Sequence, residues 1–221
     1  MYIDEIKFPP PHLAQKDGLL AVGGDLSQDR LLLAYKMGIF PWYSDSEPVL
    51  WWSPDPRFVL YPDDIKISKT LKKIIQKDIF HITVDQAFSQ VITSCARIRL
   101  QNNEGTWIDK DMIKAYCKLH ESGFAHSVEA WHEGELAGGL YGVSLGRCFF
   151  GESMFTRISN ASNVAFVFLV EYLKSLSFDM IDCQISSEHL VRFGAKEIPR
   201  EQFLCELEQL LEAPTKRGRW G

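Results

Sequence analysis

The chain has 221 residues and a formal net charge of -5, from 24 lysines and arginines against 29 aspartates and glutamates. Hydrophobic residues make up 46% and charged residues 24%, which excludes a disordered or fibrous chain. No apolar stretch approaches the roughly 20 residues of a membrane span, and the first residues lack a basic-then-apolar signal pattern. We therefore expect a cytoplasmic globular protein that does not enter a membrane, with one domain plus an appendage or two small domains.

The cysteines are odd in number and scattered along the chain. They form no C-x-x-C pair, and no histidine stands at metal-ligand spacing. We expect reduced thiols and no metal site. The five are Cys95, Cys117, Cys148, Cys183 and Cys205.

Residues 1–63, rich in Pro, Gly and Trp, are predicted to form a small N-terminal domain. A helix is predicted to follow Ser27 as its N-cap and to stop before Gly38. The stretches 39–43 and 49–57 are aromatic and interrupted by proline. We expect them to lack regular structure and to wrap over another domain.

Residues 64–221 are predicted to form the second, larger domain, in which helical and strand patterns alternate. Three consecutive strands joined by short turns indicate an antiparallel meander, and a helical crossover leads to one further strand. The predicted fold class is α+β with a mostly antiparallel sheet. Helices are expected at 68–77, 86–96, 109–121, 161–176 and 200–211, strands at 81–84, 127–132, 135–144, 147–152 and 180–184, and a short helix and strand within 189–198.

Glu152 stands where the apolar run 148–150 ends. A carboxylate at such a position is partly desolvated and is suited to orienting a cationic or amine group. The alternative is a strand-end glutamate in water. The neighbouring Ser153 does not fit a hydrolase elbow, because Phe155 stands where the strained turn needs glycine.

Asp182 and Gln184 share one face of a predicted apolar strand, by alternation. Burying two polar side chains is costly unless they bond each other or a substrate. Cys183 with His189 is an alternative nucleophile and base, but the same alternation points the thiol away from the polar pair. A buried free cysteine usually acts as a small hydrophobe.

A lysine cluster, Lys66, Lys69, Lys72, Lys73 and Lys77, contrasts with the negative net charge. Three of these lysines repeat every four residues on one predicted helical face, with no acidic residue between 65 and 77. Such a face attracts phosphates, although a merely solvated face is the alternative. Trp107 lies in a polar loop, where an indole is able to stack on a base. No phosphate-binding glycine loop is present.

Taken together, the segments closely resemble the bacterial leucyl/phenylalanyl-tRNA-protein transferase family. The matching stretches cover almost the whole chain in the same order, which makes the set specific. They are 18–27, 38–42, the run W-W-S-P-D-P-R that ends at Arg57, 104–108, 139–142, 151–155, 182–184, 194–195 and 198–200.

The resemblance implies a GNAT-like acyltransferase domain after the small N-terminal one. It also implies transfer of Leu or Phe, with Met as a further donor, from aminoacyl-tRNA to proteins that begin with Arg or Lys. This transfer marks them for N-degron degradation. No [RQ]-x-x-G-x-[GA] run for coenzyme A is present, which fits a tRNA donor. We expect a monomer that needs no cofactor, because aminolysis of an ester requires neither a metal nor a covalent intermediate.

Carried over position by position, the resemblance makes Asp182, Gln184 and Glu152 the catalytic group. It places the pocket for the donor side chain at Leu140, Phe149, Met154, Leu169 and Ile181. Contacts to the adenosine or the acceptor fall to Tyr43, Trp51, Trp52, Trp107 and Ser187, where Ser187 replaces a family asparagine. The lysine cluster is expected to bind tRNA. The alternatives are an N-acyltransferase with another activated donor, and a non-catalytic binder of tRNA or of basic N-termini.

Overall fold

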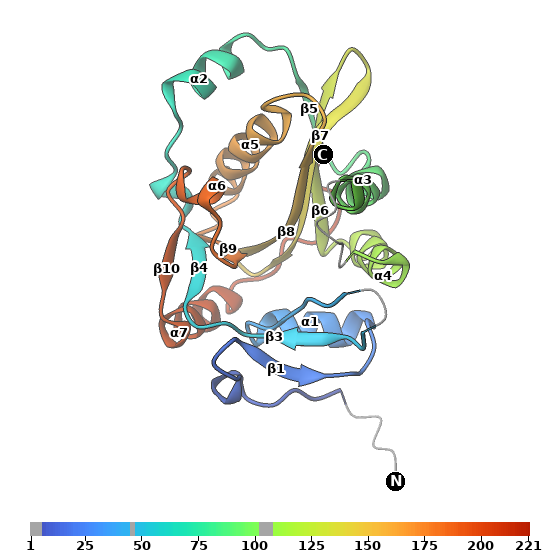
Figure 1. Cartoon of the computed structure of the whole chain (residues 1–221). Helices are drawn as coiled ribbons and strands as arrows, with labels where there is room; N and C mark the ends of the chain where they lie inside the picture. The colour runs from blue at the N-terminus through green and yellow to red at the C-terminus, as the bar shows by residue number, and fades with distance from the viewer. Residues whose placement is uncertain (1–5, 45–46, 102–107) are drawn as a thin grey trace.

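The computed structural model describes residues 6–44, 47–101 and 108–221 (Figure 1). Over these residues, a three-stranded antiparallel sheet has the order β1–β3–β2, and a seven-stranded sheet has the order β10–β4–β9–β8–β7–β6–β5. The small sheet contains β1 (Leu19–Val22), β2 (Phe40–Pro41) and β3 (Leu50–Trp52). The large sheet contains β4 (Arg57–Leu60), β5 (His81–Val84), β6 (Ala125–His132), β7 (Glu135–Leu145), β8 (Cys148–Thr156), β9 (Met180–Gln184) and β10 (Lys196–Ile198).

The large sheet is mixed, and the fold class is α+β as predicted. β8 and β9 run parallel, and the other neighbouring strands of this sheet run antiparallel. A parallel pair needs a crossover connection, which the helix α5 (Ala161–Ser175) provides. The predicted meander and crossover are therefore confirmed. No helix in the described ranges is both long and apolar enough to span a membrane.

Helices cover both faces of the large sheet (Figure 1). On one face, α2 (Lys69–Gln76) and α5 contribute to a buried apolar cluster with Phe149 and Ile181. On the other face, a second cluster joins Phe150 to residues of α1 (Gln28–Lys36), α3 (Phe88–Gln101), α4 (Lys110–Glu121) and α7 (Arg200–Leu211). The short elements are η1 (Pro11–Leu13), η2 (Pro62–Asp64) and α6 (Glu188–Val191).

Two helix starts, those of α2 and α4, have the side-chain caps that their sequences favour. The Ser68 hydroxyl accepts the N–H of Leu71, and the Asp109 carboxylate accepts the N–H of Met112. Ser27 occupies the predicted N-cap of α1, but its side chain makes no capping bond. The predicted helix 86–96 is too short, because α3 runs to Gln101.

The prediction of irregular structure in the stretches 39–43 and 49–57 is wrong. β2 and β3 form there, and the indole N–H groups of Trp51 and Trp52 donate to the backbone carbonyls of Gly23 and Trp42. β4 begins at Arg57 and pairs with β9 in the large sheet. The segment before residue 64 therefore contributes a strand to the sheet that carries the polar residues of β8 and β9.

Candidate active site

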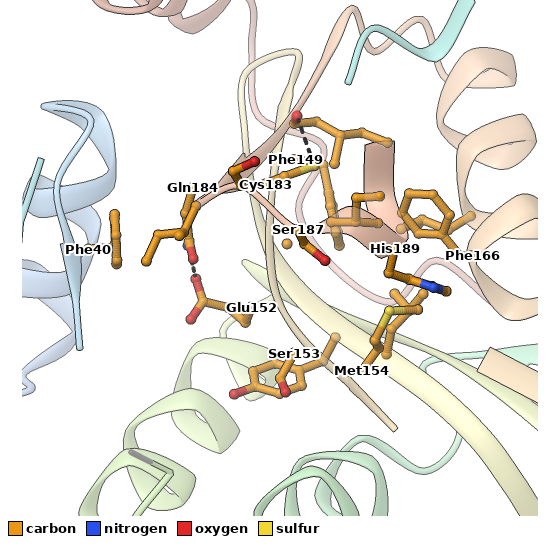
Figure 2. Close-up of a pocket in the computed structure, with 18 of the residues that line it drawn as sticks. Phe40, Phe149, Glu152, Ser153, Met154, Phe166, Cys183, Gln184, Ser187 and His189 are labelled. Carbon is orange, nitrogen blue, oxygen red and sulfur yellow. Dashed lines mark hydrogen bonds between the residues drawn. The ribbon is translucent and has the colours of Figure 1, made fainter. Parts of the chain in front are cut away.

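A cavity of about 410 Å³ opens where β8 and β9 separate (Figure 2). The two strands pair only along Cys148–Phe150 and Met180–Asp182, although β8 continues to Thr156. The volume lies within the range of small-molecule pockets. All five residues predicted for the donor side chain line it, namely Leu140, Phe149, Met154, Leu169 and Ile181.

A β-bulge places Glu152 at the edge of this cavity. Tyr141 lies opposite Ser153 and Gly142 opposite Gly151, so Glu152 is the extra residue of β8. Position 142 needs glycine, since a Cβ there would lie 2.2 Å from the carbonyl oxygen of Phe150. The bulge also shifts the alternation, which lets Phe149 and Met154 line the same cavity although they are five residues apart.

Both carboxylate oxygens of Glu152 accept hydrogen bonds. Oε1 accepts from the Tyr35 hydroxyl at 2.7 Å and from Nε2 of Gln184 at 2.9 Å. Oε2 accepts from the Tyr116 hydroxyl at 3.0 Å. The two tyrosine hydroxyls also lie within hydrogen-bond distance of each other, and their two protons serve two of these three contacts at a time when the carboxylate is ionised. Glu152 is therefore not a strand-end glutamate in water.

Burial raises the pKa of the Glu152 carboxyl from 4.5 to about 7. The hydrogen bonds from Tyr35, Gln184 and Tyr116 favour the ionised form and oppose this shift. A carboxyl with its pKa near neutrality changes charge under working conditions, which is typical of groups that handle amines or protons.

Asp182 is held by a buried arginine on β4. Arg57 donates from Nε at 2.8 Å and from Nη2 at 2.6 Å to the two carboxylate oxygens, and both side chains are almost fully buried. Oδ1 also accepts the backbone N–H of Gln184 at 2.9 Å. Asp182 is fully buried and does not line the cavity, so its contacts in this structure are with Arg57 and with the backbone of Gln184.

Gln184 lines the cavity, and its backbone has a φ of 64°, in the left-handed region. A non-glycine residue adopts this conformation at some cost, and here the bond to Asp182 helps to hold it. Figure 2 shows the side chains of Gln184 and Glu152 reaching toward each other. Their hydrogen bond joins β9 to β8 where the strands have separated.

Cys183 and His189 both line the cavity, but the Cys183 thiol donates to the carbonyl of Ile181. Burial and the nearby Asp182 carboxylate raise the pKa of this thiol well above its usual range. The neutral thiol is a poor nucleophile, which disfavours the alternative nucleophile and base. In the part of the chain that the structure describes, no group of three or more His, Cys, Asp or Glu side chains is placed to hold a metal ion.

Two family models match the chain. The model described as leucyl/phenylalanyl-tRNA protein transferase matches residues 59–208, and the model of the N-terminal domain of that enzyme matches residues 24–55. The chain belongs to the leucyl/phenylalanyl-tRNA-protein transferase family. It is therefore an enzyme of the transferase class.

Curated relatives agree over nearly the full length. Proteins named leucyl/phenylalanyl-tRNA--protein transferase from Desulfatibacillum aliphaticivorans and Syntrophobacter fumaroxidans are 59% and 56% identical, each over 98% of this chain and 93% of the relative. The one from Myxococcus xanthus is 54% identical over 96% of this chain and 91% of its own length. Among solved structures, L-PGS from Bacillus licheniformis aligns over 73% of this chain and 52% of that chain, at a TM-score of 0.41 and 11% identity.

The aromatic residues predicted for the adenosine or the acceptor are spread over different environments. Trp51 is 1% exposed in the core, so its predicted ligand contact is wrong. Tyr43 is buried with its hydroxyl on Asp109, and Trp52 is half-buried. Ser187 lines the cavity, whereas Trp107 lies outside the described residues.

The lysine cluster lies on and beside α2, which packs against α5 on the side of the sheet that carries the apolar wall of the cavity (Figure 1). All five side chains are exposed. Leu71 of the same helix is buried, so α2 has an apolar inner face and a basic outer one. This geometry suits an external polyanion and equally a solvated face.

Sequence reasoning missed Arg57 as a partner of Asp182, Tyr35 and Tyr116 as partners of Glu152, and Trp42 as a lining residue. The sequence pointed to Arg57 as a functional residue, because Arg57 ends one of the stretches that match the family. Tyr35 had none, since it belongs to the apolar face of a helix 117 residues away from Glu152.

Proposed function

We propose that this protein moves Leu or Phe, with Met as a further donor, from aminoacyl-tRNA to the N-terminal amine of proteins that begin with Arg or Lys, and so marks them for N-degron degradation. Membership of the transferase family supports the reaction class. One observation carries the assignment of the site, namely that an apolar cavity ends at a carboxylate and an amide bonded to each other, Glu152 and Gln184.

The donor side chain occupies the apolar part of the cavity. Its walls there are Leu140, Phe149, Met154, Leu169 and Ile181. An apolar pocket distinguishes one methylene by only about 1 to 3 kcal/mol, whereas it rejects charged side chains strongly because they lose their hydration. Leu, Phe and Met are therefore accepted to different degrees, and Asp or Lys is refused.

The acceptor amine binds at the polar edge. A carboxylate has about four lone-pair sites, of which Tyr35, Gln184 and Tyr116 use three on Glu152. The remaining site is on Oε2, and the amide oxygen of Gln184 is a second acceptor. Two N–H groups of a neutral amine donate to these oxygens, which aims the nitrogen lone pair at the ester carbonyl.

The reaction forms the C–N bond of the new peptide and breaks the ester C–O bond. The proton lost by the amine ends on the ribose oxygen that leaves. An amide oxygen is a weak base, so Gln184 contributes by orienting the amine. Orientation is able to raise a rate by far more than the about 10²-fold that is assigned to Gln184. Asp182 and Arg57 hold Gln184 in place and do not touch the substrate.

The tRNA body approaches along the lysine cluster, whose exposed ammonium groups replace counterions on the phosphates. Trp42 and Ser187 line the cavity and contact the terminal adenosine in this proposal, and Trp42 is 38% exposed. Aromatic rings that are open to solvent offer a stacking surface to a base. Trp52 packs against Trp42 and does not line the cavity, and neither does Tyr43.

We also propose that the large domain, residues 64–221 with β4 added from the preceding segment, is GNAT-like. A parallel strand pair that separates to admit an acyl donor supports this assignment. We further propose that the protein acts as a monomer in the cytoplasm, where charged tRNA is present.

The test combines purified protein, leucyl-tRNA and an Arg-initiated peptide, and the product is read by mass spectrometry. We expect the mass of one added leucine, no product with an Asp-initiated peptide, and no product after the tRNA is digested with ribonuclease. Formation of product after the tRNA has been digested would indicate another activated donor. Binding of both partners without any product would indicate a non-catalytic binder.

A further inference from the structure

Trp220 packs behind the wall of the cavity. Its ring centroid lies 6.2 Å from that of Phe149 and 5.7 Å from that of Phe178. Phe149 lines the cavity, whereas Trp220 does not. The indole is therefore a second layer, one side chain away from the space assigned to the donor.

Hydrogen bonds and stacking hold Trp220 in this position. The indole stacks on His126 with centroids 3.6 Å apart and planes at 9°. Its backbone N–H donates to Asp85 at 2.9 Å, and the same carboxylate bonds Nδ1 of His126 at 2.8 Å. His126 and Asp85 are buried, so the indole rests on a fixed pair.

Trp220 also contacts α5, the helix that contributes Phe166 and Leu169 to the lining of the cavity. The Tyr172 hydroxyl donates to the Trp220 carbonyl at 2.6 Å. Tyr172 follows Leu169, a lining residue, by three positions on α5, and residues three apart lie on neighbouring parts of one helix face. One residue thus touches β8 through Phe149 and α5 through Tyr172.

The Phe149 ring is closely packed. A Cβ added at Gly142 would lie 2.5 Å from Cε1 of Phe149, so the ring already sits against the backbone of β7. Phe149 is fully buried. Removal of the neighbouring indole would therefore open space beside a ring that is otherwise tightly held.

We propose that Trp220 is a specificity-determining residue, which sets the depth of the donor cavity by supporting Phe149. The inference rests on the proposed function, because it takes the cavity to be the donor site. With the indole present, the wall cannot retreat, and the cavity favours a branched aliphatic side chain. With the indole removed, Phe149 moves outward and the cavity favours a larger aromatic one.

The experiment measures kcat/KM for leucyl-tRNA and phenylalanyl-tRNA with an Arg-initiated peptide, in the wild type and in Trp220→Ala, Trp220→Leu and Trp220→Phe. The ratio of the two values does not depend on the fraction of folded enzyme, so partial unfolding does not disturb the readout. We expect the Leu-to-Phe ratio to fall about tenfold in Trp220→Ala, the lower end of what one methylene is worth in a pocket. The ratio for Trp220→Leu should lie between those of the wild type and Trp220→Ala, and the ratio for Trp220→Phe should be close to that of the wild type. If Trp220→Ala does not fold, Trp220→Leu decides.

A double-mutant cycle tests the route through Phe149. In a Phe149→Ala background, Trp220→Ala should leave the ratio unchanged, because the side chain that transmits the effect is absent. As a control, Arg217→Ala removes the bond to Ser122 and the contact with the Phe124 ring, and it should keep the ratio because the indole stays.

Equal losses for both donors in Trp220→Ala and Trp220→Leu would overturn the inference and leave the proposed function intact. The inference would also be overturned if Trp220→Ala lowered the Leu-to-Phe ratio as much in the Phe149→Ala background as in the wild type. A wild-type protein that transfers neither amino acid would overturn the proposed function itself, and with it this inference.

Discussion

Gln184 donates its side-chain amide to Glu152 over 2.9 Å, across the opening between β9 and β8. A strand irregularity lies at each end of this bond. Glu152 is the extra residue of β8 against β7, and Cys183, just before Gln184, is the extra residue of β9 against β4. Bulges redirect side chains, and here they bring an amide and a carboxylate together at the edge of an apolar cavity.

Glu152→Gln should change the pH dependence of stability. The raised pKa of the Glu152 carboxyl means that folding favours its protonated form, so ionisation costs stability as pH rises from 4.5 to about 7. The amide variant has no such cost. Its free energy of unfolding, relative to the wild type, should rise by about 1 to 3 kcal/mol over this range, allowing for screening at the open side. Urea unfolding at several pH values measures this, and parallel curves for the two proteins would refute it.

Tyr35→Phe should move the pH profile of kcat/KM to higher pH. The Tyr35 hydroxyl lowers the pKa of Glu152 by favouring the carboxylate, so its removal raises that pKa, and the site needs the carboxylate to hold the amine. A hydrogen bond to a charged group predicts a shift of about one pH unit. Tyr61→Phe is the matched control, because it removes a tyrosine hydroxyl that donates to a different carboxylate, that of Glu206. It should leave the pH profile unchanged. If the pH profile of Tyr35→Phe did not shift, the Glu152 carboxylate would not be the group that holds the amine.

Asp182→Ala should destabilise the protein by about 3 to 5 kcal/mol, because it leaves Arg57 buried and unpaired. The double variant Asp182→Ala with Arg57→Met removes both charges and should recover much of this stability. The transfer rate should stay about 10²-fold low in both variants, because neither holds the backbone of Gln184. Thermal melts and transfer rates on the same samples distinguish a positioning role of Asp182 from a purely structural one. Recovery of activity together with stability would make Asp182 merely structural.

Replacing Lys69, Lys72, Lys73 and Lys77 with Ala should raise the KM for aminoacyl-tRNA and flatten its salt dependence. The total charge of the chain is negative, but a local cluster acts within a Debye length of about 8 Å at physiological salt. Turnover with a minimal aminoacyl-adenosine donor should hardly change, because that donor lacks the phosphate backbone. An unchanged salt slope would show that the cluster is only a solvated face.

Periodicity sufficed for the meander and the crossover. The predicted alternation of β9 holds for Ile181, which packs in the apolar cluster on the α5 side, and for Asp182, which bonds Arg57. The prediction that Gln184 shares the face of Asp182 is wrong, because the extra residue Cys183 interrupts the alternation between them. Periodicity cannot show a bulge, so the shared orientation of Phe149 and Met154 came only from the family resemblance. It also cannot show contacts between distant segments, such as Arg57 with Asp182.

The N-terminal segment was the hardest to predict, because short strands rich in Trp and Pro lack a repeating pattern. β2 has two residues and β3 has three, and side-chain bonds such as that from Trp51 to Gly23 add to their pairing. Local propensity says little about such contacts.

The central claim is that Gln184 positions the amine at the donor ester, and single-turnover transfer from saturating leucyl-tRNA to an Arg-initiated peptide tests it most directly. Gln184→Ala should slow the step about 10²-fold, while tRNA affinity and the melting temperature stay near those of the wild type. Gln202→Ala, an equivalent change on the exposed surface of α7, should transfer at the wild-type rate. A wild-type rate in Gln184→Ala would contradict the claim and remove the Glu152–Gln184 bond from the mechanism.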